Sequence, residues 1–261
     1  MVLTRRVLRR GAVALAVCGM VAGAAQPAQA DIVYIGQDAS VHTTFPDAGD
    51  LLRNSIRFAA NGILDPSIAL FDGGGFGGNP AAFLASLGFT DVTSIAPSAI
   101  GTTTLSDYDV LYFAPTTSSP AVAFYTAAAA SILAYTLADG GLVVEPEVFA
   151  TGSWGWVPYA ALIGHSGTTN VGGDSISVVA PLHPVMSGVT SAGLSGWGFS
   201  AHTTFATPGA AGFTTLAIVN DRAGIADIIA LEIAAVPEPV STALLGVGLV
   251  GYAMRRRRKS Q

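Results

Sequence analysis

Basic residues are confined almost entirely to the two ends of the chain, and each basic group borders an uncharged apolar stretch. Four arginines between Arg5 and Arg10 precede the apolar residues 11–24, and the basic run 255–259 follows the apolar residues 240–254. Residues 31–235 hold three arginines, no lysine and sixteen carboxylates, a formal charge of −13. This pattern predicts two ends that interact with a membrane and one acidic domain between them.

The acidic domain excludes some classes of partner. A domain without basic patches repels phosphate backbones, so we expect no nucleic-acid partner. The same charge is compatible with divalent cations or neutral polyhydroxyl ligands. The single cysteine, Cys18, lies in the first apolar stretch, so a chain without that stretch has no disulfide, thiolate nucleophile or cysteine metal site.

Residues 1–30 have the three parts of a secretory signal peptide: a basic start, an apolar centre and small residues at Ala28 and Ala30. We expect the translocon to export the chain and signal peptidase to cut after Ala30. The apolar centre is shorter than the roughly 20 residues that a membrane span needs. Residues 4–8 also resemble a twin-arginine signal, although Arg9 stands where an apolar residue is expected, so both export routes remain open.

The C-terminal residues 236–261 also have three parts. A short motif, 236–239, comes first, the uncharged segment 240–254 is predicted to be a transmembrane helix, and the basic run 255–259 closes the chain. Basic side chains resist translocation and stay on the cytoplasmic side, which places the acidic domain outside. An ordinary single-span anchor that is never cut is the alternative.

This order of parts resembles the PEP-CTERM sorting signal. The resemblance implies a Gram-negative host, recognition and cleavage by an exosortase, release or attachment at the cell surface, and association with exopolysaccharide and biofilm matrix. The residues that it assigns to sorting and processing are Val236, Pro237, Glu238, Pro239, Arg255, Arg256, Arg257 and Arg258.

The acidic domain alternates short apolar runs with segments of helical spacing, which predicts an α/β fold with a mostly parallel sheet sandwiched by helices. Buried strands are predicted at 91–95 and 109–113, and further strands at 32–35, 67–71, 142–145, 175–179, 214–219 and 225–233. Helices are predicted at 47–60, from Asn79-Pro80 to Gly88, and at 119–139. No charge occurs from Val110 to Ala138, but the Ala-rich composition favours a crossover helix on the sheet over a membrane span.

Three pieces of the domain resemble the class I glutamine-amidotransferase-like fold, a flavodoxin-like sandwich. They are residues 67–78, the strand pair 108–115 and 140–145, and the His-Pro segment 183–188, which is similar to trehalose-utilisation-like members of that group. The family's catalytic cysteine belongs just after the strand that ends at Glu145, where this chain has Pro146 and Glu147. The resemblance therefore implies the fold without the amidotransferase activity.

Polar residues follow the predicted parallel strands, whose carboxyl ends meet at one edge of the sheet. The carboxylates among these residues could bind Ca²⁺ or Mg²⁺, or act as acid and base on a glycosidic bond. The alternative is that the polar residues only cap helices and turns. These candidates are Asp38, Asp72, Asn79, Thr116, Glu145 and Glu147.

Other motifs are weaker. The loop 73–78 fits G-x-G-x-x-G, but no basic residue lies nearby, so a tight turn is favoured over a phosphate site. The four histidines lack metal-ligand spacing, so no metal site is predicted, and His202 is the histidine we would test first. Trp154 and Trp156 lie in Gly- and Ser-rich loops, where they serve as platforms for sugar rings or as buried anchors.

The sequence thus favours a non-enzymatic exported protein of the cell surface or extracellular matrix that binds polysaccharide. One alternative is a hydrolase of carbohydrates or amides that uses Asp72, Glu145 or Glu147. Another is a Ca²⁺-dependent adhesion module, which rests on the acidic charge of the domain.

Overall fold

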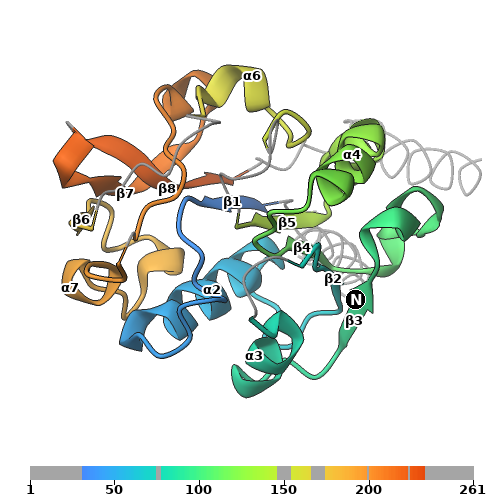
Figure 1. Cartoon of the computed structure of the whole chain (residues 1–261), viewed down its shortest axis with the longest axis horizontal. Coiled ribbons are helices and arrows are strands. Elements are labelled where there is room, and N and C mark those ends of the chain that lie inside the picture. The colour runs from blue at the N-terminus through green and yellow to red at the C-terminus, as the bar shows by residue number, and fades with distance from the viewer. Residues whose placement is uncertain are drawn as a thin grey trace, which may run out of the picture. The chain divides into compact units, whose positions relative to one another are not determined.

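An eight-stranded mixed sheet runs through the acidic domain in the order β3-β2-β4-β5-β1-β8-β7-β6 (Figure 1). The computed structural model describes residues 31–74, 78–145, 154–165, 174–198, 200–222 and 224–232, all within a unit that covers residues 29–234. The strands are β1 (Asp31–Ile35), β2 (Ile68–Phe71), β3 (Val92–Ile95), β4 (Val110–Phe113), β5 (Gly141–Val144), β6 (Ile176–Val178), β7 (Thr214–Val219) and β8 (Ile225–Glu232). The first five are parallel and the last three antiparallel, which confirms the predicted α/β class with a mostly parallel sheet.

Helices cover both faces of this sheet, and Figure 1 shows them as one layer above and one below the strands. One face carries α2 (Pro46–Ala59), α3 (Pro80–Ser86), α7 (Ser191–Leu194) and the 3₁₀ turn η3 (Pro184–Met186). The other carries α4 (Ser119–Ala127), α5 (Ala129–Leu137), α6 (Ala160–Ile163) and the 3₁₀ turns η1 (Pro97–Thr102), η2 (Leu105–Asp107) and η4 (Pro208–Ala211). Side chains of β1 alternate between the two cores: Val33 packs in the first and Tyr34 in the second.

The strands β1, β2, β4 and β5 are covered on both faces and, apart from Asp31 at the start of β1, are apolar. All residues of β1, β2, β4 and β5 are buried. The edge strand β3 differs: its residues are half-buried or exposed, so the prediction of a buried strand at 91–95 is wrong. An edge strand has a neighbour on one side only, and the polar Thr93 and Ser94 fit that position.

The predicted single helix at 119–139 is two helices. A break at Ala128 separates α4 from α5, which are bent relative to each other by 57°. No single helix among the described residues is long and apolar enough to cross a membrane, and this bent pair meets the requirement only by length and composition. The pair packs Tyr125 and Ile132 into the core of the sheet, as expected of a crossover connection.

The position of β1 departs from the flavodoxin-like order that the amidotransferase resemblance implies. In that order the first strand lies between the second and third. Here β2 is flanked by β3 and β4, and β1 pairs instead with β5 in parallel and with β8 in antiparallel. The strands predicted at 214–219 and 225–233 are β7 and β8, which pair in antiparallel, and the turn η5 (Asn220–Arg222) lies between them.

Candidate site at the carboxyl edge of the sheet

The loop after β1 and the loop between α7 and η4 meet at Gly36. The backbone N–H groups of His202 and Thr203 both donate to the carbonyl oxygen of Gly36, at 2.8 and 3.0 Å. A side chain at Gly36 would overlap the carbonyl oxygen of Thr203 and the Oδ1 atom of Asp227. The missing side chain therefore allows two segments from opposite ends of the domain to come together.

Asp38 lies between two imidazole rings. Its Oδ1 atom is 3.1 Å from Nε2 of His202 and 3.2 Å from Nε2 of His42. Asp38 and His202 are buried, while the side chain of His42 is 23% exposed. Burial opposes ionisation of Asp38, but hydrogen bonds from His202 and His42, together with their charge, outweigh it and hold the pKa of the carboxyl group below its ordinary value.

Glu145 follows β5 and lies beneath the loop after β1. Its Oε2 atom accepts hydrogen bonds from the Ser40 hydroxyl at 2.7 Å, the Ser40 N–H at 3.3 Å and the Tyr112 hydroxyl at 2.9 Å. Its Oε1 atom is buried and has no hydrogen-bond partner among the described residues. Burial raises the pKa of Glu145 to about 7, with the hydrogen bonds from Ser40 and Tyr112 opposing the shift and the nearby Asp38 adding to it.

A further buried carboxyl group lies on β8. Asp227 accepts a hydrogen bond of 2.9 Å from the Gln37 side chain. Burial raises the pKa of Asp227 well above its usual range, against the hydrogen bond from Gln37 and the charge of His202. The carboxyl edge of the sheet therefore combines three buried carboxyl groups with two histidines.

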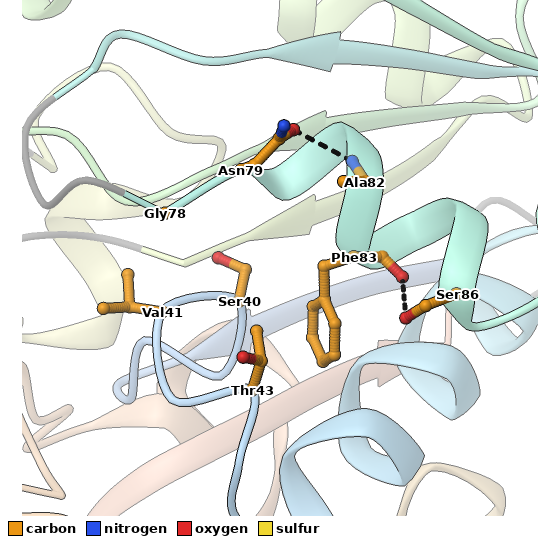
Figure 2. Close-up of a pocket in the computed structure, with 8 residues that line it drawn as sticks. All are labelled: Ser40, Val41, Thr43, Gly78, Asn79, Ala82, Phe83 and Ser86. Carbon is orange, nitrogen blue, oxygen red and sulfur yellow. Dashed lines mark hydrogen bonds between the residues drawn. The ribbon is translucent and has the colours of Figure 1, made fainter.

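An open cavity of about 550 Å³ lies next to this cluster, between residues 40–43 and α3. Figure 2 shows Ser40, Val41 and Thr43 on one side and the residues of α3 on the other, with the Phe83 ring directed toward the loop. None of the lining residues is ionisable; they are Ser40, Val41, Thr43, Gly78, Asn79, Ala82, Phe83 and Ser86. Ser40 joins the two features, because it lines the cavity and also binds Glu145.

Other candidates from the sequence lie outside the cluster. The exposed Asp72 accepts a hydrogen bond from the Gly74 N–H, and Asn79 caps α3 by accepting one of 3.0 Å from the Ala82 N–H (Figure 2). The Thr116 hydroxyl donates to the carbonyl oxygen of Gly74. Asp72 and Asn79 thus have the turn and capping contacts that were the alternative to a ligand role, and Asn79 also lines the cavity.

The two candidate tryptophans are buried anchors, the alternative to platforms for sugar rings that the sequence left open. Trp154 is 0% exposed and donates a hydrogen bond of 3.1 Å to the Thr203 hydroxyl. Trp156 is 4% exposed and packs against Phe113, with ring centroids 4.6 Å apart. Neither ring has a free face for a sugar.

Several site residues were not found from the sequence. Ser40, Tyr112, Gln37 and Asp227 belong to apolar strands or to short loops without a recognisable motif. The spacing of four between Asp38 and His42 was a signal, but His202 is far away in the sequence and only the fold brings it near. His165 and His183 lie elsewhere: His165 is in a β-bridge with Phe205, and His183 caps η3.

Some sequence predictions concern positions outside the described residues. These positions are Glu147, the expected cleavage position at Ala28 and Ala30, and residues 236–261.

Residues 235–258 match the PEP-CTERM protein-sorting motif, which confirms the resemblance of the C-terminal segment. Among curated proteins and among solved structures, no significant match to the chain is found. The chain therefore carries a sorting signal for an exosortase, consistent with export to the cell surface, while the resemblance of the domain to amidotransferases is not confirmed.

Proposed function

We propose that the protein is exported, processed by an exosortase, and binds a neutral polysaccharide of the extracellular matrix through the cavity between residues 40–43 and α3. The sorting motif at 235–258 supports the first part. The composition of the cavity wall supports the binding of a neutral polysaccharide: the wall offers hydroxyl and amide groups beside the Phe83 ring and no ionisable side chain. Its volume of about 550 Å³ is in the range of small-ligand sites.

The acidic charge of the domain favours neutral over acidic polysaccharides as ligands. With three arginines against sixteen carboxylates between residues 31 and 235, the domain repels acidic polysaccharides and is indifferent to neutral ones. Hydroxyl groups of a neutral sugar exchange hydrogen bonds with Ser, Thr and Asn side chains, which the cavity wall supplies.

A glycan array and a pull-down with the purified mature protein test this proposal. We expect binding to neutral polysaccharides in preference to acidic ones. Ala82→Trp fills the cavity from the exposed face of α3 and should abolish binding, while Ala85→Trp, on the same helix but outside the cavity wall, should leave it unchanged. A wild-type protein that binds no neutral glycan, or equal binding by both variants, would contradict the proposal.

The second candidate, a carboxylate-dependent hydrolase, is favoured by Glu145. Its raised pKa of about 7 suits a general acid at neutral pH, and Ser40 connects it to the cavity wall. Release of reducing sugar ends from a bound glycan, lost in Glu145→Gln while glycan binding persists, would support hydrolysis. Binding without any release by the wild-type protein would remove this candidate.

A further inference from the structure

Two histidines and one aspartate, brought together from two distant loops, have the geometry of a metal-ligand set. The three side chains are Asp38, His42 and His202, and one ligand atom from each lies within 4.8 Å of the others. We propose that these residues bind one divalent transition-metal ion, of which Zn²⁺ is the best fit. The proposal is independent of the polysaccharide cavity, because none of the three residues lines it.

The observed distances suit a small ion. Zn²⁺ binds imidazole nitrogens and carboxylate oxygens at about 2.0–2.2 Å, so ligand atoms around a tetrahedral ion are roughly 3.3 Å apart. The distances of 3.1 and 3.2 Å from the Asp38 Oδ1 atom to the two histidine Nε2 atoms are close to that value. Only small side-chain movements would be needed to receive the ion.

The donor set also selects the type of ion. Imidazole suits zinc, copper, iron and nickel, whereas Ca²⁺ and Mg²⁺ prefer sites made of oxygen atoms. Two imidazole nitrogens and one carboxylate oxygen resemble the ligand sets of catalytic zinc ions, which leave a position open to water or a ligand. The half-buried His42 is the most exposed of the three side chains, so the ion would be reached from that side.

The surrounding structure holds the ligands in place without the ion. The His202 N–H donates to Gly36, and the His42 N–H donates to the carbonyl oxygen of Asp38 at 3.2 Å. The His42 ring packs against Phe45 and Trp197, with centroid distances of 5.6 and 5.3 Å. Ligands that are fixed by such contacts lose little freedom on binding, which favours affinity. The acidic charge of the domain also concentrates cations near its surface.

Metal content and zinc titration of the purified mature protein test this inference. After removal of bound metal with a chelator, we expect one Zn²⁺ to bind per chain, and the melting temperature to rise with zinc. His202→Gln and His42→Gln should each weaken zinc binding by roughly 100-fold or more, since even residues that only orient metal ligands contribute 10–100-fold. His165→Gln and His183→Gln, outside the cluster, are the matched controls and should bind zinc as the wild type does.

Two further measurements check that the variants fold and that the site prefers a transition metal. His42 is partly exposed, so His42→Gln is expected to fold, and circular dichroism of each variant without metal checks this. Millimolar Ca²⁺ should leave the melting temperature unchanged, and an equal rise with Ca²⁺ and Zn²⁺ would overturn the assignment to a transition metal. Failure of the wild type to retain stoichiometric zinc, or equal loss in the His165→Gln control, would overturn the site itself. These measurements use no glycan, so their failure is separate from failure of the proposed function.

Discussion

The Ser40 hydroxyl donates a hydrogen bond of 2.7 Å to the Oε2 atom of Glu145, a residue 105 positions later in the chain. The contact joins the loop after β1 to the end of β5. Because Glu145 is only 1% exposed, its carboxyl group depends on Ser40 and Tyr112 in place of water. The buried carboxyl group of Glu145 therefore makes the stability of the domain sensitive to pH.

Glu145→Gln should flatten part of the pH dependence of stability. The pKa of Glu145 is raised from 4.5 to about 7, so its stabilising contribution is complete below about pH 4.5 and is lost as the pH rises through about 7. At 1.36 kcal/mol per pKa unit, the free energy of unfolding of the wild type should fall by about 3 kcal/mol relative to the variant across this range. Urea unfolding at a series of pH values measures the difference.

That experiment is best made on protein from which metal has been removed, so that binding at Asp38 and the histidines does not contribute. The lowered pKa of Asp38 acts in the opposite direction, with stability lost as the pH falls, and it is common to both proteins. Parallel stability curves for the wild type and Glu145→Gln would show that the buried carboxyl group does not titrate in this range.

Gly36→Ala should destabilise the domain strongly. The added methyl group would overlap the carbonyl oxygen of Thr203 and the side chain of Asp227, and backbone atoms cannot move away easily. We expect a loss of about 2–3 kcal/mol, at the upper end for overpacking. Gly101→Ala is the control, since a methyl group there meets nothing within 4 Å. Similar melting temperatures for the two variants would refute the close approach at Gly36.

Trp154→Phe tests the buried tryptophan. The change removes the hydrogen bond to the Thr203 hydroxyl and leaves that hydroxyl buried, at a cost of about 1–3 kcal/mol. Trp154→Ala also removes the packing on Tyr34 and Phe205 and should cost about 3–5 kcal/mol. Leu182→Ala, at a residue 97% exposed, should change the unfolding free energy by no more than about 0.5 kcal/mol. Direct contact between a glycan and the Trp154 ring, detected as a shift in the fluorescence of Trp154 on glycan binding, would be inconsistent with its burial.

Mass spectrometry of the protein recovered from its host tests both ends of the chain. We expect the mature chain to start at Asp31 and to lack the basic run 255–259 after exosortase cleavage near the sorting motif. A variant in which Pro237, Glu238 and Pro239 are replaced by alanine should keep its C-terminus and remain in the membrane fraction. Recovery of an uncut wild-type chain would show that the motif is not processed.

Strands and helices with a clear apolar pattern could be predicted from the sequence, and the site could be predicted only in part. The central strands are recognisable because they are buried on both faces, whereas β3 was predicted as buried although Thr93 and Ser94 are polar. No glycine or proline lies near the break at Ala128, so the sequence there does not indicate that the helix is interrupted. Asp38 and Glu145 were found because residues after parallel strands share one edge. The pairing of Asp38 with His202 depends on the loop between α7 and η4 reaching the loop after β1, a contact between segments far apart in the chain.

The place of β1 in the sheet has a consequence for maturation. Three of its residues pair with β5 on one side and all five pair with β8 on the other, and its first residue, Asp31, is the expected start of the mature chain. A cut even a few residues downstream would remove the seam between the parallel and antiparallel halves and leave two open edges prone to aggregation. We therefore expect the domain to fold only when the leader is removed without loss of β1.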